Sequence, residues 1–384
     1  MKKSLLYVLN SRMPSEKGYG IQTVNSCNAL SEFYNVNLCY QQRSKNIGFD
    51  EFYGIDCGRF KKNPIFTGEL SLFYNISPLF WFLCLQIIFY FRFLFIEDLK
   101  KYNIIFTRDE NCALILEILK RIGFLENTKV CFEAHTYNKK FVFLKKIDFI
   151  FTLTDFSGKM FERFRKNIFV LPDAVDSNLF KKHRKSNYLR TRFNVESSKK
   201  ILLYTGKSIT CGMEKGIFNI IEAVSEINDI VFFCVGGPDY MIEKYKKYII
   251  RKNYNQEKFY FIDHVKYTLI PKITNSADIV LLYMPDNLHF SKYASPLKMF
   301  EYLCSGKPVI LSELQNLKKF SELCRAEINF VEPENPQLLR EKIIQIISQY
   351  EQYFENSQKN IVIAENFTWK KRAYHIKNII SKEI

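Results

Sequence analysis

SPLKMFEYLCSGKPV, residues 295–309, is an apolar segment that carries one lysine and one glutamate three residues apart. Ser295 suits the N-cap of a helix, Pro296 its first position, and Gly306 the left-handed residue that ends it. We therefore expect a short buried helix here, placed between two strands. Its N-terminus would present unpaired backbone N–H groups and the positive end of the helix dipole, which favour an anion.

Lys298 and Glu301 would lie one turn apart on one face of this helix. The helix end could meet a phosphate and the carboxylate a ribose. The alternative is a semi-buried salt bridge that holds the helix to its neighbours, and a bare Lys-x-x-Glu pair favours that structural interpretation.

The rest of the chain predicts an α/β fold. Short apolar runs bounded by turn residues alternate with helical patterns, which is typical of parallel sheets with helices on both faces. We expect strands at 5–9, 36–40, 104–107, 130–133, 149–153 and 168–171, and then at 201–206, 230–237, 259–263, 278–284 and 308–312. Two doubly wound halves result, and ligands would bind outside the carboxyl ends of their strands, in a cleft where the halves face each other.

The domain boundaries follow from composition. The polar, basic stretch 181–200 is the expected linker. We expect an N-terminal domain over 1–185, a C-terminal domain over 186–365, and a helix over 366–384 that packs back on the N-terminal domain.

Charge and cysteine usage restrict the partners and the compartment. Lys+Arg of 56 against Asp+Glu of 40 gives a net charge of +16 over 384 residues, which implies an anionic partner such as phosphate, lipid head groups or nucleic acid. The charge is spread through both halves without a nucleic-acid recognition motif, so nucleic acid is not expected as a partner.

The ten cysteines are scattered and form no C-x-x-C pair, which indicates a reduced, cytosolic protein. The N-terminal apolar run stops at Asn10 with no cleavage site, so we interpret it as a strand and not as a signal peptide.

One segment, LFWFLCLQIIFYFRFLFI at residues 79–96, is nearly as long and apolar as a membrane span. We favour a helix packed against a sheet. The alternative is a helix that lies in the membrane interface. A true span is disfavoured because Arg92 would lie in hydrocarbon.

Residues 295–309 resemble the signature helix of glycosyltransferase family 4, the retaining, sugar-nucleotide-dependent enzymes of the glycosyl transferases group 1. Further segments agree with that family in order and spacing: LLYTGKSITCGMEKGIFNIIEAV (202–224), FVLPDAVDSNLF (169–180), FEAHT (132–136) and NSRMPSEKGYGIQTVNSCNAL (10–30). The resemblance covers essentially the whole chain. It implies the GT-B fold, two facing Rossmann-like domains with the site between them.

The resemblance also implies roles for single residues. Glu301 matches the carboxylate that binds the ribose hydroxyls, and Lys207 and Lys215 match the cations that neutralise the diphosphate of the leaving nucleotide. Fixed cations would stabilise the charge that develops when the sugar–phosphate bond breaks. The other positions expected to contact the donor are Gly206, Tyr293, Ser295, Pro296, Leu297 and Lys298, the last two through backbone N–H groups.

Three residues of the N-terminal half, His135, Gly18 and Gly20, are expected to belong to the site. His135 resembles the histidine that family members place near the sugar and the reacting centre, and Glu133 beside it is expected to be structural. Gly18 and Gly20 would let the backbone approach the donor phosphate or the acceptor. The same stretch is a broken dinucleotide fingerprint with Thr23 at the last glycine position, so we do not expect nicotinamide binding.

Tyr293 departs from the family, because many members carry there a glutamate that contacts the donor sugar. We interpret the change as altered sugar recognition. The sequence has no Asp-x-Asp pair, so neither a metal nor another cofactor is expected, and the helix dipole and lysines would neutralise the phosphates.

The sequence thus predicts a metal-independent hexosyltransferase that moves a sugar from a nucleotide-sugar to a glycan or lipid-linked acceptor. We expect it in lipopolysaccharide, capsule or other surface polysaccharide synthesis, in the cytoplasm or peripherally on the inner face of the membrane, where an anionic surface would be a partner. Two alternatives stay open: a nucleotide-sugar epimerase or hydrolase of the same fold, and a catalytically inactive membrane-associated scaffold, which Tyr293 would favour.

Overall fold

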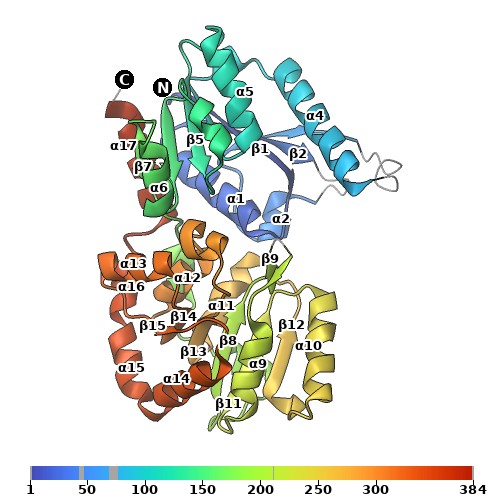
Figure 1. The fold of residues 1–384 in the computed structure, drawn as a ribbon, viewed down its shortest axis with the longest axis vertical. Coiled ribbons are helices and arrows are strands. Elements are labelled where there is room, and N and C mark those ends of the chain that lie inside the picture. Colours follow the sequence, from blue (N-terminus) through green and yellow to red (C-terminus); the bar gives the residue numbers. More distant parts are fainter. Residues whose placement is uncertain (1, 43–46, 69–76, 211, 383–384) are drawn as a thin grey trace. The chain divides into compact units, whose positions relative to one another are not determined.

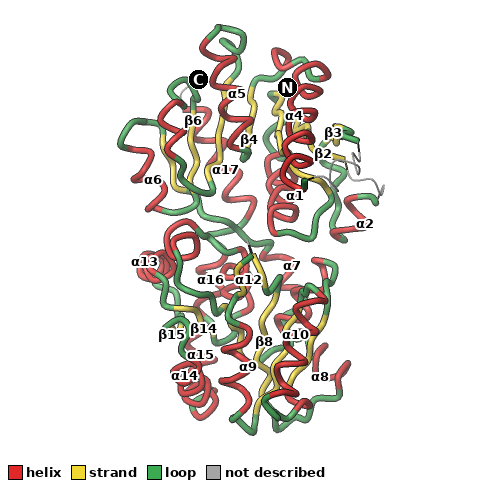
Figure 2. Tube along the Cα trace, turned by 45° about the vertical axis from the view of Figure 1, so that its right-hand side comes forward, coloured by secondary structure: helices red, strands yellow, loops and turns green. Residues whose placement is uncertain are grey.

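The computed structural model describes residues 2–42, 47–68, 77–210 and 212–382. The chain forms two compact units. Unit 1 comprises Met1–Pro172 and Trp369–Ile384, and unit 2 comprises Asp173–Thr368. Each unit is an α/β layer structure, and Figure 2 shows helices on both sides of the strands in each. The predicted fold class is confirmed.

Unit 1 contains, within the described residues, a seven-stranded sheet in the order β3-β2-β1-β4-β5-β6-β7, with parallel neighbours throughout (Figure 1). The strands are β1 (Ser4–Met13), β2 (Asn35–Gln42), β3 (Lys61–Ile65), β4 (Ile104–Thr107), β5 (Lys129–Ala134), β6 (Phe149–Thr152) and β7 (Ile168–Val170). The helices are α1 (Gly18–Leu30), α2 (Phe49–Tyr53), α4 (Pro78–Ile96), α5 (Glu110–Arg121), α6 (Asp155–Glu162) and α17 (Trp369–Lys382).

The two faces of this sheet are covered by different helices. Side chains alternate between faces along a strand. Val130 and Phe132 of β5 join a core with Phe89 of α4 and Leu116 of α5. Glu133 points to the other face, where its carboxylate contacts residues of α1 and α17. The C-terminal helix therefore completes the face of the sheet that α1 also covers.

Unit 2 contains, in its described residues, a six-stranded parallel sheet in the order β12-β11-β8-β13-β14-β15 and a separate antiparallel hairpin of β9 and β10. The strands are β8 (Lys200–Thr205), β9 (Ile209–Thr210), β10 (Met213–Glu214), β11 (Ile230–Val235), β12 (Phe259–Ile262), β13 (Ile279–Leu282), β14 (Val309–Ser312) and β15 (Asn329–Val331). The helices are α7 (Ser177–Lys182), α8 (Tyr188–Phe193), α9 (Ile217–Ser225), α10 (Asp239–Arg251), α11 (Ile270–Asn275), α12 (Leu297–Ser305), α13 (Gln315–Cys324), α14 (Pro336–Ser348), α15 (Tyr350–Ser357) and α16 (Lys359–Ala364).

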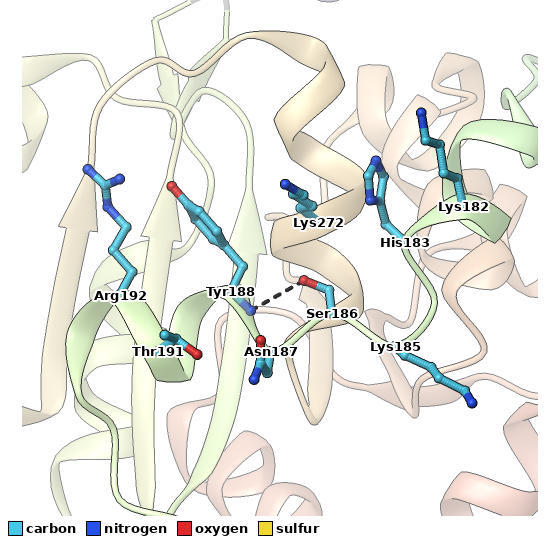
Figure 3. Close-up of a pocket in the computed structure, with 9 residues that line it drawn as sticks. All are labelled: Lys182, His183, Lys185, Ser186, Asn187, Tyr188, Thr191, Arg192 and Lys272. Atoms are coloured by element: carbon cyan, nitrogen blue, oxygen red, sulfur yellow. Dashed lines mark hydrogen bonds between the residues drawn. The ribbon is translucent and has the colours of Figure 1, made fainter.

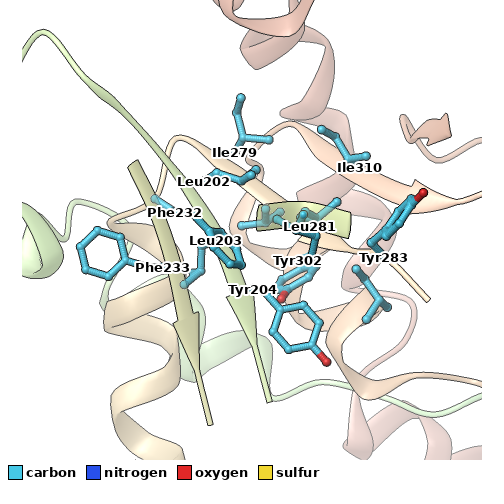
Figure 4. Packing of buried hydrophobic residues seen from close by; sticks show 14 of the residues in the cluster. Leu202, Leu203, Tyr204, Phe232, Phe233, Ile279, Leu281, Tyr283, Tyr302 and Ile310 are labelled. Atoms are coloured by element: carbon cyan, nitrogen blue, oxygen red, sulfur yellow. The ribbon is translucent and has the colours of Figure 1, made fainter. Parts of the chain in front are cut away.

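The central strands of unit 2 are apolar along their whole length because both faces of the sheet are covered. Leu202, Leu203 and Leu281 are fully buried, as Figure 4 shows. Burying one such side chain contributes about 1.5–3 kcal/mol. This core fixes the carboxyl ends of β8, β11 and β13, and the unit 2 site residues described below follow these strands in the sequence.

The unit boundaries differ from those expected. The chain passes from unit 1 to unit 2 at Pro172/Asp173, not near residue 185, and returns at Thr368/Trp369. The stretch 181–200 is not a linker, because it forms α8 and part of α7, Leu189 in it is fully buried, and Arg190 pairs with Asp278 at 2.6 Å. The helix expected over 366–384 is α17, which belongs to unit 1 and packs on α1.

The eleven strands predicted from the sequence are all found, and their ends shift by a few residues. Four short strands were missed. β3 and β15 lie at sheet edges, and β9 and β10 have two residues each. Such short segments contain too few residues to show a period.

The apolar segment Leu79–Ile96 is helical, as expected, but it is not a fully packed core helix. It is long and apolar enough to cross a membrane, and 17% of it is buried. One face, with Leu85, Phe89 and Phe93, packs into unit 1, while Ile87 and Phe91 are among the exposed apolar residues of the opposite face. α4 thus has two apolar faces: one packs against the core of unit 1, and the other is exposed.

Candidate functional site

In unit 2, the carboxyl ends of β8 and β11 meet backbone to backbone. Gly206, directly after β8, has φ 103° and donates its N–H to the carbonyl of Val235 at 2.6 Å. Gly236, directly after β11, has φ 129°, and a Cβ placed on it would lie 2.7 Å from the carbonyl carbon of Gly206. The positive φ favours glycine at both positions, and at Gly236 the backbone of Gly206 also leaves no space for a side chain.

The side chain of Lys298 lies over Gly206. A Cβ on Gly206 would lie 2.0 Å from Cε and 2.2 Å from Nζ of Lys298. Burial lowers the pKa of this ammonium group, and the nearby Glu301 carboxylate opposes that shift. The first turn of α12 thus places a cation directly on the glycine that ends β8.

α12 begins one residue later than expected. Pro296 is its N-cap, in an extended conformation, and no side chain caps the first turn, in which Leu297 and Lys298 lie. The N-cap prediction for Ser295 is therefore wrong: its hydroxyl accepts instead from the backbone N–H of Asp173 at 3.0 Å. The prediction for the other end is confirmed, since Gly306 is left-handed at φ 67°.

Glu301 is nearly fully buried in α12, with 7% of its surface exposed. Burial raises the pKa of its carboxyl group, while the charge of Lys298 and a hydrogen bond with the Tyr267 hydroxyl act against that rise. Lys298 and Glu301 are electrostatic neighbours on one helix, as the spacing predicts. A buried carboxylate with a phenol and an ammonium beside it can accept hydrogen bonds from the hydroxyls of a ligand.

The loop after β8 holds the two predicted phosphate-binding lysines. The carbonyl of Lys207 accepts from the Tyr204 hydroxyl at 3.0 Å, and the N–H of Lys215 donates to the carbonyl of Ser208 at 2.8 Å. Both backbones are thus held at the base of the β9–β10 hairpin.

The N-terminus of α9, beside Lys215, is already occupied by a carboxylate of the chain itself. Glu214 accepts from the N–H groups of Gly216 and Ile217, each at 2.7 Å, and from the Tyr245 hydroxyl at 2.9 Å. The sequence predicted a basic loop and helix start here but missed this cap. An anionic ligand would therefore be met by the Lys215 side chain, not by the end of α9.

Tyr293 ends a π-helical turn, His289–Tyr293, that precedes α12. The Nζ of Lys215 lies 6.0 Å from the ring centroid of Phe290 in this turn. Burial, followed by the charge of Lys215, lowers the pKa of His289. The structure thus brings Lys215 to the turn that carries Tyr293 and leads into α12.

In unit 1, His135 follows β5 and is 25% exposed, at the edge of a group of polar side chains in which Glu133 is fully buried. Its Nε2 is 2.8 Å from Oε1 of Glu133, and its Nδ1 is 3.3 Å from a guanidinium nitrogen of Arg108. Gln22 of α1 donates to the same Glu133 oxygen at 3.3 Å and also bonds Arg108. Burial, followed by the charge of Arg108, lowers the pKa of His135 to about 4, so the imidazole is neutral at pH 7.

The two predicted glycines of unit 1 have different settings. Gly18 is the first residue of α1. A Cβ on Gly20 would lie 2.4 Å from the hydroxyl of Tyr53 and 2.5 Å from the carbonyl oxygen of Ser15. Gly20 is thus required by packing within unit 1, and its approach to a ligand stays a prediction.

Part of unit 2 is similar to a known protein family. Residues 199–349 match the model of the family described as Glycosyl transferases group 1. The match begins one residue before β8 and ends between α14 and α15, so it contains all the donor residues of unit 2 named above. No curated protein matches the chain.

Solved structures extend the comparison to the whole chain. HepE of Anabaena, in complex with UDP-glucose, superposes with a TM-score of 0.71 at 14% identity, over 99% of this chain and 100% of that one. The sucrose-phosphate synthase of Thermosynechococcus elongatus gives 0.73 at 14% identity, over 99% of each chain. The lipopolysaccharide outer core galactosyltransferase WaaB gives 0.65 at 13% identity, over 99% and 100%. The chain therefore has the GT-B fold.

Several residues of unit 2 and of unit 1 were missed from the sequence. Tyr267, Glu214 and His289 stand in no periodic or motif pattern, and Arg372 lies in a run of basic residues that gives no reason to select it. Arg108 directly follows β4, and its position at the carboxyl end of a parallel strand is a signal that could have identified it.

A pocket of about 500 Å³ lies elsewhere in unit 2 (Figure 3). Its lining includes Lys182, His183, Lys185, Arg192 and Lys272, and none of the donor residues named above. The lysines and the arginine are exposed, which is typical of a solvated basic surface. This surface accounts for part of the net charge of +16.

Proposed function

We propose that this chain is a retaining glycosyltransferase of family 4 that transfers a hexosyl group from a nucleotide-sugar. The observation that carries the proposal is the arrangement in unit 2, where Lys298 lies on Gly206 and the buried Glu301 lies beside it. This arrangement belongs to a domain that matches the glycosyl transferases group 1 model.

In this proposal each group has a defined task. Glu301 accepts hydrogen bonds from the ribose hydroxyls, and Lys207 and Lys215 meet the diphosphate, whose charge grows as the sugar leaves. His135 lies near the sugar. Transfer proceeds on one face of the sugar while the leaving phosphate oxygen helps to deprotonate the acceptor. No metal takes part, so transfer should continue in EDTA.

The proposed acceptor is a glycan or a lipid-linked glycan in surface polysaccharide synthesis, on the cytoplasmic side of the membrane. Two observations support this proposal: the exposed apolar face of α4 and the net charge of +16. WaaB, a structural neighbour, is described as a lipopolysaccharide outer core galactosyltransferase.

The first test is a thermal-shift panel of UDP, GDP, ADP and CMP on the wild type and on Glu301→Ala. A ligand that binds only the folded state raises the melting temperature. At a ligand concentration a hundredfold above Kd, it increases the free energy of unfolding by about 2.7 kcal/mol. We expect one nucleotide to stabilise the wild type and not the variant. A panel without any shift would contradict the donor site.

The second test is sugar transfer itself. Glu301→Ala and Lys215→Ala should each lose most of the activity, on the order of 100-fold, because each removes a group that contacts the donor. Glu341→Ala and Lys244→Ala, at exposed positions of the same unit, are the matched controls. Near-normal rates in folded Glu301→Ala or Lys215→Ala would mean that the donor site is assigned wrongly.

Tyr293 is the observation that favours an inactive scaffold, because many family members have a glutamate there. Donor turnover with an acceptor supports the transferase, and turnover without any acceptor supports an epimerase or hydrolase. Nucleotide binding without turnover in the wild type, together with activity in Tyr293→Glu, would favour the scaffold.

A further inference from the structure

Arg372, on the C-terminal helix α17, forms a buried ion pair with Glu133 of β5. The guanidinium NH2 group lies 2.7 Å from Oε2 of Glu133, and the side chains are 5% and 0% exposed. The two residues are 239 positions apart in the sequence. An ion pair removed from water in this way is retained only where its geometry and remaining hydrogen bonds are satisfied.

The rest of the guanidinium is held as well. Nε of Arg372 donates to the carbonyl of Pro172 at 2.9 Å, and NH2 also reaches the carbonyl of Leu171 at 3.4 Å. These carbonyls belong to the last residues of the first segment of unit 1. Arg372 is thus fixed by backbone on one side and presents its charge to Glu133 on the other.

The second carboxylate oxygen of Glu133 contacts His135. Oε2 is taken by Arg372, and Oε1 lies 2.8 Å from Nε2 of His135. A carboxylate only accepts, so Nε2 must carry the proton. A neutral imidazole has one N–H, which leaves Nδ1 as an acceptor, and Arg108 donates to it at 3.3 Å.

The electrostatics agree with this assignment. Burial opposes the charge on Glu133, but Arg372 and the hydrogen bond from His135 outweigh it and hold the pKa of Glu133 well below its ordinary value. Burial and the Arg108 charge lower the pKa of His135 to about 4. The ionised carboxylate and the neutral imidazole therefore coexist at pH 7.

We propose that Arg372 is a positioning residue: through Glu133 it fixes His135 with Nε2 protonated and the Nδ1 lone pair available to accept from a ligand hydroxyl. The inference rests on the proposed function for the role of His135 in transfer, but the geometry at His135 can be tested without it. A ligand hydroxyl would take the place of Arg108 at Nδ1, since that contact is the longer of the two to the imidazole.

The first experiment is ¹⁵N NMR of the histidine side chains, of which the chain has five. In the wild type we expect His135 to be protonated at Nε2 alone and not to titrate between about pH 5.5 and 8, where free histidine does. In Arg372→Met the buried Glu133 loses its cation, so His135 should take up a proton and titrate within this range. A wild-type proton on Nδ1, or an unchanged titration in Arg372→Met, would overturn the proposal.

Glu133→Gln covers the case in which Arg372→Met does not fold, because the guanidinium of Arg372 keeps the carbonyls of Pro172 and Leu171 and an amide oxygen as acceptors. A glutamine amide can donate to Nε2 as well as accept from it, so both tautomers of His135 should appear. A single Nε2–H tautomer in Glu133→Gln would contradict the role of the carboxylate.

The second experiment measures transfer kinetics. Arg372→Met should lower kcat by about 10–100-fold, the usual effect of losing a group that orients a functional side chain, with KM for the donor unchanged. Arg372→Lys, which keeps the charge, should recover part of kcat. Lys370→Met is the matched control, because Lys370 is 73% exposed on the same helix and pairs with Glu32. Equal kcat in Arg372→Met and Lys370→Met would contradict the positioning role.

The two experiments separate the two proposals. A wild type without transfer activity but with the expected tautomer and titration would reject the proposed function and keep the role of Arg372 in setting His135. Transfer activity together with a different tautomer of His135 would keep the proposed function and reject the role of Arg372.

Discussion

Gly206 is the residue at which a single methyl group would most directly disturb the donor half of the site. Its φ of 103° disfavours any side chain, and the space that a Cβ would need is filled by Lys298. A side chain here would therefore strain the backbone and move the end of the Lys298 side chain away from the glycine.

Gly206→Ala is expected to destabilise unit 2 and to abolish stabilisation by the nucleotide. The backbone should cost about 1–3 kcal/mol, and displacement of the flexible end of Lys298 should act on nucleotide binding. Gly123→Ala is the matched control, because Gly123 also has a positive φ, 78°, but a Cβ there would meet nothing within 4 Å. Chemical unfolding and the thermal shift with nucleotide measure both effects. If both variants lost the stabilisation by nucleotide to the same extent, the position of Lys298 would not depend on Gly206.

At the scale of elements, α12 and α4 show what a local pattern can decide. Both ends of α12 were predicted from residue types, and the start was wrong by one residue because Ser295 bonds to Asp173 instead of capping the helix. For α4 the pattern predicts a helix but not its neighbours, since apolar residues lie on both of its faces.

The exposed face of α4 is expected to bind anionic membranes. Ile87→Glu and Phe91→Glu, at positions 68% and 61% exposed, should each reduce co-sedimentation with vesicles of phosphatidylglycerol and phosphatidylcholine at low salt. Val362→Glu in α16, 70% exposed, is the matched control and should bind as the wild type does. A wild type that does not sediment with these vesicles would remove the membrane part of the proposal.

At the scale of the whole molecule, the chain is divided unequally. Unit 2 is one continuous segment, Asp173–Thr368, whereas unit 1 needs both ends of the chain. α17 supplies Arg372 to Glu133 and the buried side chains of Ala373, Ile376 and Ile380 to the surface beside α1.

We therefore expect residues 173–368 to fold alone and to keep the stabilisation by the nucleotide. Residues 1–172 should be unstable, because Glu133 would be a buried charge without its partner, which typically costs about 3–5 kcal/mol. Joining 369–384 to 172 through a short flexible linker should restore cooperative thermal unfolding, measured by circular dichroism. A stable fragment 1–172 would show that α17 contributes little.

The sequence by itself determined the alternation of strands and helices, the parallel sheets, the left-handed end of α12 and the placement of Lys298 and Glu301 one turn apart on that helix. These features depend on residues a few positions apart, and the apolar period and the turn residues record such contacts directly. The family resemblance selected the donor positions for the same reason, because most of them lie in short continuous segments.

Only the tertiary structure decided the partners of those residues. The contacts of Arg372 with Glu133, of Ser295 with Asp173 and of Tyr267 with Glu301 join distant segments, and neither residue of such a pair carries a local signal for the other. The true crossing points between the units and the uncovered face of α4 are of the same kind. They depend on which surfaces meet when the whole chain has folded. A local sequence pattern shows that a surface is apolar, but it does not identify the segment that packs against it.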